Sequence, residues 1–327
     1  MRRSVALVAV LTIALAACSH TDSKKLELRV GQTGWTQSAA ALKVAGLDDT
    51  PYKIDWPVFS GGDKQMEALR AGALDVGQSS EIPPIFAAVA GTPNFKVIAV
   101  QRASTLLQEV VVGKNSTITD IAGLKGKKVG YVPNTTAHYF LYKLLEQAGL
   151  SWQDITPAPL LPKDGVAALG SGSIDALASY GNSIITVHQS GGRAIGTGKD
   201  ILSGNFQWLT SDKVIADDAE RGAVVDLIAR LNKAYAYIRA GHQQEYAQAV
   251  SDATHQPLAD ALNQLKDQEA QRPTTFGPTD ATAIASQQQV ADAFTQLGAI
   301  PGKLEVSSIW TDKLNPELTA ALAKGTS

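Results

Sequence analysis

Apolar and polar residues alternate in some stretches of the chain and recur every three to four residues in others, the patterns of strands and helices respectively. In the first third of the chain, short strand-like stretches precede longer helical ones, and glycine or proline separates them. Strands are predicted over residues 26–30, 52–59, 74–77 and 96–101, and helices over 37–45, over 63–71 with Asp63 as N-cap, and from Pro83–Pro84 onward. This alternation favours mostly parallel sheets with helices on both faces.

A second run of alternating elements begins near residue 110. Its predicted elements are strands over 110–112, 127–131 and 177–179, a short helical piece over 121–126, and a helix that starts at Thr135–Thr136 and ends before Gly149. The two runs have the same order of strands and helices. The pattern therefore predicts two lobes of one α/β design.

The two runs also share a short sequence motif. Residues 68–76 read ALRAGALDV, and residues 168–176, 100 positions later, read ALGSGSIDA. Gly72 and Gly172 are expected to end a helix in the left-handed conformation. Asp75 and Asp175 then stand at the start of a strand. Because ligands of open α/β sheets bind beyond the carboxyl ends of strands, we expect structural roles for both aspartates.

The pattern after residue 224 is helical and shows no further strand–helix repeat. Helices are predicted over 224–239, 243–254, 257–267, 279–297 and 315–324. We predict lobe 1 over 26–110, lobe 2 over 111–205, and a return over 206–327 to lobe 1 with the C-terminal helices. The hinges between the lobes are expected near 110–114 and 205–209.

The first residues have the composition of a secretory signal. Arg2 and Arg3 precede an apolar run over residues 5–17, which ends in small residues before Cys18. The sequence Leu-Ala-Ala-Cys resembles the lipoprotein box of bacteria, in which the cysteine is lipidated after cleavage. Residues 1–17 are therefore predicted to be a signal peptide and 18–25 a tether. The alternative is an ordinary cleavage site with a chance cysteine.

Composition excludes several classes of protein. The 327 residues carry 18% charged and 44% hydrophobic residues, which suits a folded chain with a sizeable core. Without residues 1–17, 27 Lys and Arg remain against 31 Asp and Glu, a net charge of −4, so no nucleic-acid-binding surface is expected. Cys18 is the one cysteine, which excludes an internal disulfide. The five histidines include no pair at helical metal-ligand spacing, and no nucleophile elbow is present, so we expect neither a metal or cofactor nor enzymatic activity.

Small polar residues follow several predicted strands at the point where a helix begins. Helix N-termini carry unpaired N–H groups and partial positive charge, so hydroxyl-bearing junctions suit anions. The alternative for each Ser or Thr is simple helix capping. The candidate ligand-binding residues are Gln32, Thr33, Trp35, Ser79, Ser80, Glu81, Thr135, Thr136, Tyr180 and Asn182.

The chain resembles bacterial ABC-transporter substrate-binding proteins of the aliphatic-sulfonate, taurine and nitrate type. The resemblance is carried by FSGG at 59–62, ALRAGALDVG at 68–77, IAGLKGKKV at 121–129, TAHY at 136–139 and GSIDA at 172–176. It implies the fold of the type II periplasmic binding proteins, with two crossovers and a ligand cleft between two α/β lobes. It also implies delivery of the ligand to a permease and an ATPase by a lipid-anchored, extracytoplasmic and monomeric receptor.

The resemblance places Thr135 and Thr136 at the anion-binding helix start of lobe 2. Many members have Trp-Asp-Pro-aromatic where this chain reads Tyr-Gly-Asn-Ser over 180–183, which leaves the ligand open. No arginine stands in the candidate junctions, which favours a sulfonate over a carboxylate. One alternative is a receptor for a thiamine-pyrimidine precursor or another nitrogenous molecule. A remote alternative is an enzyme on this scaffold, in which His138 or Glu81 would act.

Overall fold

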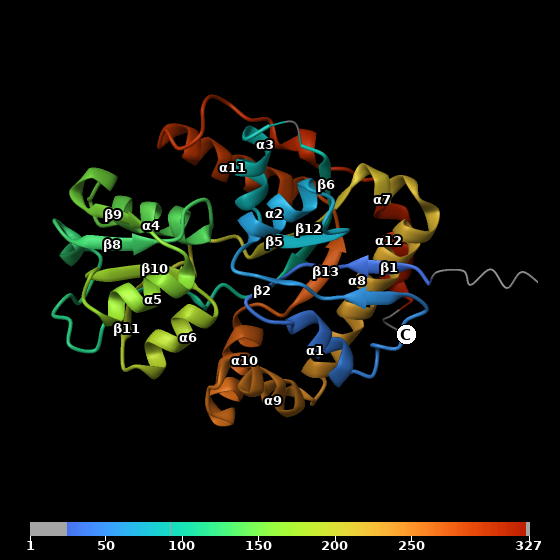
Figure 1. Ribbon diagram of the computed structural model, residues 1–327, viewed down its shortest axis with the longest axis horizontal. Coiled ribbons are helices and arrows are strands. Elements are labelled where there is room, and N and C mark those ends of the chain that lie inside the picture. Colours follow the sequence, from blue (N-terminus) through green and yellow to red (C-terminus); the bar gives the residue numbers. More distant parts are fainter. Residues whose placement is uncertain (1–24, 92, 325–327) are drawn as a thin grey trace, which may run out of the picture.

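The computed structural model describes residues 25–91 and 93–324. Two bodies lie side by side in it, each built on its own sheet (Figure 1). We define lobe 1 by the four-stranded sheet with the order β13-β6-β12-β5, and lobe 2 by the five-stranded sheet with the order β11-β7-β10-β8-β9. The predicted signal peptide and Cys18 lie outside the described residues. Among the described helices, none is long and apolar enough to cross a membrane.

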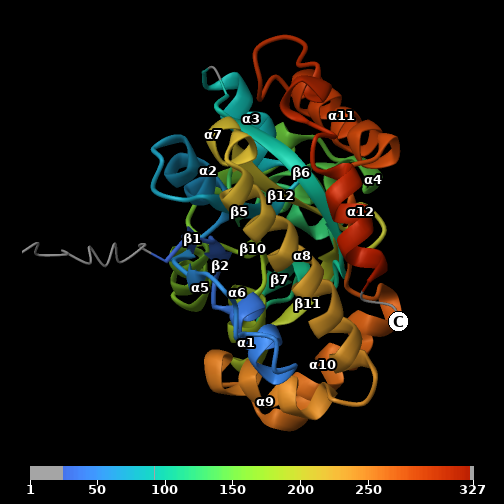
Figure 2. The ribbon, with the colours of Figure 1, turned by 90° about the vertical axis from the view of Figure 1, so that its right-hand side faces the viewer.

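Lobe 1 is a sheet covered by helices on both faces (Figure 2). Its strands are β5 (Val76–Ser80), β6 (Phe95–Arg102), β12 (Asn205–Ser211) and β13 (Thr275–Pro278), extended by the short parallel pairs β1 (Glu27–Arg29) with β3 (Lys53–Asp55) and β2 (Gln32–Thr33) with β4 (Val58–Phe59). One face packs on α1 (Gln37–Val44) and α8 (Asp218–Arg239), the other on α2 (Gly62–Arg70), α3 (Pro83–Val89) and α11 (Ala281–Gln296). This layering buries β6 residues such as Val97 and Ile98 completely.

Lobe 2 repeats the layering around a smaller core. Its strands are β7 (Gln108–Val112), β8 (Lys128–Tyr131), β9 (Thr156–Pro159), β10 (Ala176–Tyr180) and β11 (Arg193–Thr197). Helix α4 (Thr136–Gln147) and the short η1 (Ala122–Leu124) cover one face, and α5 (Pro162–Gly170) and α6 (Asn182–Gln189) cover the other. The 3-10 turn η2 (Trp152–Asp154) precedes β9.

The prediction of mostly parallel sheets is wrong in this detail. The pairs β8–β9 and β8–β10 are parallel, but β7 is antiparallel to β10 and β11, and β12 is antiparallel to β5 and β6. The crossovers explain the difference. Strands β6 and β11 end at the cleft, and the chain then crosses to the other lobe, where β7 and β12 begin at the cleft. Strands β7 and β12 therefore run antiparallel to their neighbours, which end at the cleft. An α/β repeat alone does not reveal this reversal.

The predicted hinges need the same correction. Residues 110–112 belong to β7 and residues 205–209 to β12, so the chain crosses earlier, over residues 103–107 and 198–204. The two crossovers are adjacent, because the backbone N–H of Ala103 donates to the carbonyl of Gly204 at 3.0 Å. Both connections therefore lie together at one side of the cleft.

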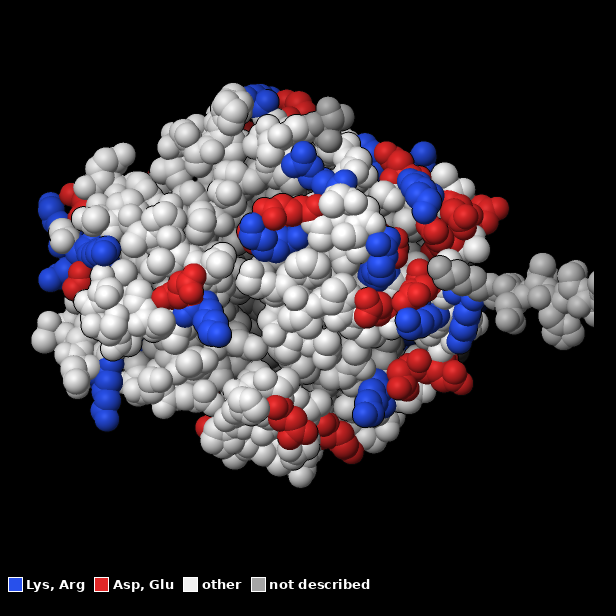
Figure 3. Space-filling view, viewed as in Figure 1, with Lys and Arg blue, Asp and Glu red and all other residues white. Residues whose placement is uncertain are grey.

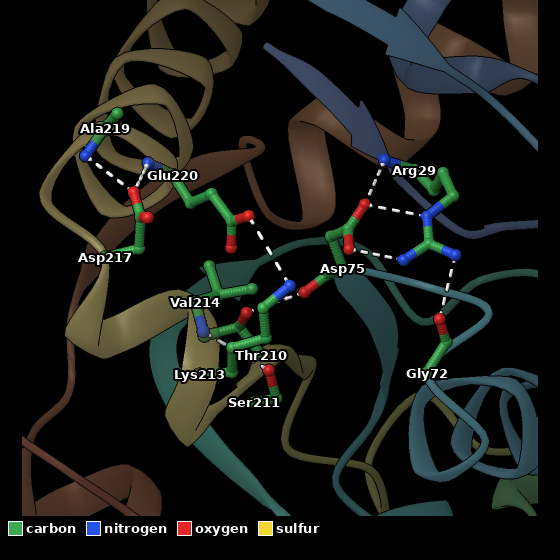
Figure 4. A network of polar contacts seen from close by, with 10 residues as sticks. All are labelled: Arg29, Gly72, Asp75, Thr210, Ser211, Lys213, Val214, Asp217, Ala219 and Glu220. Carbon is green, nitrogen blue, oxygen red and sulfur yellow. Dashed lines mark hydrogen bonds and ion pairs between the residues drawn. The ribbon is translucent and has the colours of Figure 1, made fainter.

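The internal repeat has the predicted structural origin. Gly72 and Gly172 follow α2 and α5 with φ of +70° and +72°, the left-handed region that glycine adopts without strain. The Asp75 carboxylate accepts hydrogen bonds from the backbone N–H of Arg29 and from its guanidinium (Figure 4). Asp175 accepts from the backbone N–H of Lys128 in the same way. Asp75 thus joins the start of β5 to the end of β1, and Asp175 joins the starts of β10 and β8, away from the cleft.

The C-terminal region contains the predicted helices and one strand that the pattern does not show. Besides α8 and α11 it holds α7 (Asp212–Ala216), α9 (Gln243–Thr254), α10 (Leu258–Gln271), η3 (Val306–Ile309) and α12 (Asn315–Ala323). Strand β13 pairs with β6 and closes that edge of the lobe 1 sheet. The helix predicted from 224 begins earlier, since Asp217 caps it by accepting from the N–H groups of Ala219 and Glu220.

Two boundaries in lobe 1 also differ from the prediction. The strand expected over 52–59 is broken into β3 and β4, because Pro57 lies between them and has no N–H to donate. Helix α2 begins after Gly61 in extended conformation, so Asp63 lies in its first turn and is not its N-cap.

Candidate functional site

The cleft between the lobes contains a small cavity of about 90 Å³. Lobe 1 contributes the end of β5 and the start of β12, and lobe 2 contributes the start of α4 and the end of β10. The cavity is lined by Thr33, Gln37, Gly62, Gln78, Ser79, Ser80, Pro83, Gln108, Thr135, Thr136, Tyr180 and Phe206. Six of these are predicted ligand-binding residues, taken from junctions far apart in the sequence. The fold therefore brings them to one place.

A second cavity of about 190 Å³ continues from the first and shares Thr33, Gln37 and Tyr180 with it. Its remaining lining includes an apolar wall of Trp35, Leu107, Pro162, Ile185, Tyr246, Val250 and Leu265, and polar residues such as Asn182 and Gln268. Both cavities are smaller than the ~300–1,000 Å³ of pockets for drug-sized molecules, which favours a small ligand. No Asp, Glu, Lys or Arg lines either of them.

Charged side chains lie on the outer surface and not in the lining of the cavities. Figure 3 shows acidic and basic side chains on both sides of the groove between the lobes, and many more over the far end of lobe 1. An anion in this cleft would therefore be held by hydrogen-bond donors and helix ends, without a paired cation.

The start of α4 faces the small cavity. Thr135 is the N-cap of this helix, and its Oγ1 accepts from the N–H of Ala137 at 3.2 Å while donating to the carbonyl of Val132 at 2.8 Å. The Thr136 hydroxyl donates to Oε1 of Gln108 at 2.6 Å. Both hydroxyl protons are engaged within the protein, and the N–H groups of Ala137 and His138 already donate to Thr135. The Thr136 N–H is therefore the donor of the first turn that this end offers to a ligand.

Tyr180 stands between the two cavities at the end of β10. Its hydroxyl is buried and has no hydrogen-bond partner among the described residues. Burial, with a smaller effect of the nearby Asp63 carboxylate, raises the pKa of this phenol above its usual value. The next residue, Gly181, has φ +56° and ψ −131°, a conformation that residues with a side chain rarely adopt. The backbone therefore turns sharply between β10 and α6, at a position that favours glycine.

Lobe 1 supplies further donors. Nε2 of Gln65 donates to the Thr33 hydroxyl at 2.9 Å, which leaves the Thr33 proton for a ligand. The Ser79 hydroxyl instead donates to the carbonyl of Ser80 at 2.8 Å. The Ser80 oxygen accepts only a long bond of 3.5 Å from the N–H of Ile82, so its proton also remains to be donated.

Two predicted residues, Trp35 and Asn182, reach the larger cavity and not the smaller one. Trp35 packs against Tyr246 of α9, with ring centroids 6.2 Å apart. The residues that sequence reasoning missed are mainly glutamines and aromatics: Gln37, Gln78, Gln108, Phe206 and Tyr246. Gln78 directly precedes the predicted Ser79, which is the one signal that could have identified it.

Gln32 and Glu81 do not reach the cavities, which corrects their predicted ligand contacts. The Gln32 side chain is fully buried, donates to the carbonyl of Gly31 at 2.9 Å and accepts from the N–H of Ser38 at 2.9 Å. It therefore positions the loop before α1. The Glu81 carboxyl accepts from the hydroxyls of Ser203 and Ser286. Burial raises the pKa of Glu81 to about 7.

The residues named for an enzymatic alternative are not assembled for catalysis. His138 lies in an aromatic cluster, with its ring centroid 4.9 Å from that of Tyr131 and 5.0 Å from that of Trp152. Burial lowers the pKa of His138 to about 4, so the imidazole is neutral at physiological pH.

Arg102, the last residue of β6, is the arginine nearest in the sequence to the predicted junctions. Its guanidinium pairs with the Asp280 carboxylate. Within the described residues, no group of three or more His, Cys, Asp or Glu could hold a metal ion.

Comparison with known proteins agrees with this geometry. Residues 58–243 match the family model described as NMT1/THI5 like. A relative from Escherichia coli (strain K12), named "Putative aliphatic sulfonates-binding protein", is 31% identical over 310 residues, which cover 93% of each chain. The solved alkanesulfonate-binding protein SsuA from Xanthomonas axonopodis pv. citri, bound to MOPS, is 26% identical with a TM-score of 0.77 and covers 87% of this chain and 98% of that one.

The same scaffold also carries an enzyme. The desulfurization enzyme DSZB is 15% identical with a TM-score of 0.68 over 92% of this chain and 99% of its own, a similarity that shows the fold alone. The family model and the sulfonate-binding relatives, in contrast, match this chain in sequence across most of its length. The chain therefore belongs to the NMT1/THI5-like family, as a substrate-binding protein of the aliphatic sulfonate and taurine group of ABC transporters with the type II periplasmic-binding-protein fold.

Proposed function

We propose that the cleft binds a sulfonate with a small, uncharged tail and that the protein delivers it to an ABC permease. The observation that carries the proposal is the buried hydroxyl of Tyr180, which has no hydrogen-bond partner among the described residues and belongs to a side chain that lines both neutral cavities. An anion would accept from this hydroxyl, from the hydroxyls of Thr33 and Ser80, and from the Thr136 N–H at the start of α4.

The charge-free lining supports a sulfonate head over a carboxylate. A carboxylate commonly recruits a bidentate arginine, and Arg102 is engaged by Asp280. A sulfonate stays ionised across the physiological pH range, and several neutral donors can share its three oxygens. The MOPS-bound relative shows that a sulfonate fits this fold.

The larger cavity supports an uncharged tail. Its wall includes Leu107, Ile185, Val250 and Leu265, which would contact alkyl or ring carbons of the ligand. An ammonium group, as in taurine, would find no carboxylate among the lining residues. Alkanesulfonates are therefore the preferred ligands in this proposal, and taurine a weaker one.

Delivery and location extend the proposal beyond the described residues. The permease and its ATPase would receive the ligand from a monomeric receptor, held at the outer face of a bacterial membrane by a lipid on Cys18. Substitution Cys18→Ser tests the anchor: the chain should move from the membrane fraction to the soluble fraction. A chain that remains membrane-bound after this substitution would contradict the lipid anchor.

Calorimetric titration of the mature chain tests the ligand. Ethanesulfonate and propanesulfonate should bind with one site per chain, nitrate and taurine more weakly, and a pyrimidine not at all. Absence of heat with every sulfonate would refute the proposal. Tight pyrimidine binding would favour the receptor for a nitrogenous molecule, and turnover of a bound ligand would favour an enzyme.

A further inference from the structure

Glu81 is buried, and other parts of the chain donate two hydrogen bonds to its carboxyl and one to its backbone carbonyl. The Ser203 hydroxyl donates to Oε1 at 2.7 Å, and the Ser286 hydroxyl donates to Oε2 at 3.0 Å. Nε2 of Gln287 donates to the Glu81 carbonyl at 2.7 Å. The residue is 4% exposed. Each oxygen of the residue thus has a fixed partner.

These partners link the cleft to the connection between the lobes. Glu81 directly follows Ser79 and Ser80, which line the small cavity. Ser203 lies in the second crossover, over residues 198–204, and Ser286 lies on α11. A change in the charge of the Glu81 carboxyl therefore acts on the loop that carries Ser79 and Ser80, and on the crossover that carries Ser203.

Among the described residues, no cation pairs with this carboxyl. The crossover presents Ser203 to it, β12 presents Asn205, and α11 presents Ser286. Tyr139 of α4 also lies nearby; its pKa is raised mainly by burial, is lowered by Lys143, and is raised slightly by Glu81 and Glu146. Burial raises the pKa of Glu81 to about 7, and the hydrogen bonds only partly offset this. A second anion nearby would favour the protonated form further, because like charges disfavour each other's ionisation.

We propose that Glu81 is a positioning residue and that its carboxylate takes up a proton from solvent when the cleft binds an anion. The resulting carboxylic acid donates its O–H to the oxygen of Ser203 or Ser286, so the loop after β5 and the crossover stay joined without a buried charge. This inference rests on the proposed function, since it requires an anionic ligand in the cleft.

Titration of the parent chain with ethanesulfonate between pH 6 and 8.5 measures this coupling, because the ligand itself does not titrate there. The dissociation constant should rise with pH, by about threefold to tenfold per pH unit above pH 7. Protons taken up on binding come from the buffer, so the observed binding enthalpy depends on the ionisation enthalpy of the buffer. At pH 7.5, the binding enthalpies in phosphate and in Tris should therefore differ by a fraction of the difference between the ionisation enthalpies of these two buffers. A dissociation constant and an enthalpy independent of pH and buffer would overturn the inference while leaving the proposed function intact.

Variants assign the proton to Glu81. Glu81→Gln should bind ethanesulfonate with a dissociation constant that is flat across this pH range. His188→Gln is the matched control, because His188 lies on α6, pairs with Glu109, and has its pKa raised by that contact. A pH dependence that persists in Glu81→Gln and vanishes in His188→Gln would overturn the assignment. If Glu81→Gln does not fold, Glu81→Asp, which keeps a titrating carboxyl, should retain the proton uptake. No binding at any pH would instead refute the proposed function.

Discussion

Replacing Tyr180 by phenylalanine removes one hydroxyl and keeps the ring that lines both cavities. In the unliganded protein this hydroxyl is buried without a partner, a state that costs about 1–3 kcal/mol. The substitution should therefore leave the free energy of unfolding unchanged or raise it. Binding should respond in the opposite direction, because the ligand loses a donor.

The size of the binding loss follows from the kind of bond. A hydrogen bond to a charged group contributes about 1.5–3 kcal/mol, so Tyr180→Phe should weaken sulfonate binding by about 10- to 150-fold. Opposite signs for stability and affinity distinguish this role from general damage to the fold, which would lower both.

Calorimetry and urea unfolding of the same preparations measure the two effects. Tyr142→Phe is the matched control, because its hydroxyl donates to Glu146 at 2.8 Å on the exposed side of α4. It should bind ethanesulfonate like the parent chain. Unchanged affinity in Tyr180→Phe would show that the hydroxyl does not face the ligand and would refute the reasoning.

Three further predictions concern closure, stability and pH. A Cβ at Gly61 would lie 2.6 Å from the Asp63 carboxylate and 2.9 Å from the Tyr180 hydroxyl across the cleft, so Gly61→Ala should weaken binding about tenfold or more by calorimetry, whereas Gly113→Ala, with nothing within 4 Å, should not. Asp75→Ala removes the acceptor that joins the end of β1 to the start of β5, and should lower the urea unfolding free energy by about 1–3 kcal/mol with an unchanged dissociation constant. Because the pKa of Glu81 is raised from 4.5 to about 7, its contribution to stability is fully present below pH about 4.5 and is lost as the pH rises through 7. Measured as the difference from Glu81→Gln, the unfolding free energy of the parent should therefore fall by about 2–3 kcal/mol over that range, because the opposite contribution of the buried, neutral His138 is common to both chains.

Local sequence chemistry predicted the parts of the fold that depend on neighbouring residues. The cap at Thr135 and the left-handed glycines after α2 and α5 occur where the sequence places them. Strand β13 was missed because its four residues include Gly277 and Pro278 and show no strand pattern. It forms only because β6 offers it a free edge, which is a property of the assembled sheet.

The sequence predicts which strand–helix junctions form the site. It does not predict which side chains at those junctions point into the cavity. Ser80 and Glu81 are adjacent, yet Ser80 faces the cavity while the Glu81 carboxyl meets Ser203 and Ser286, which lie 122 and 205 residues further along the chain. Tyr246 enters the larger cavity from a C-terminal helix that carries no junction signal. Such contacts depend on how distant elements pack, and a single sequence does not show them.

The central claim is that neutral donors in the cleft hold a sulfonate. A crystal structure of the mature chain with propanesulfonate tests it most directly. We expect the sulfonate oxygens within hydrogen-bond distance of the Tyr180 hydroxyl and of the Thr136 N–H, and the propyl carbons against the wall that contains Leu107 and Val250. A sulfonate bound outside the cleft, or paired there with a lysine or arginine, would contradict the account.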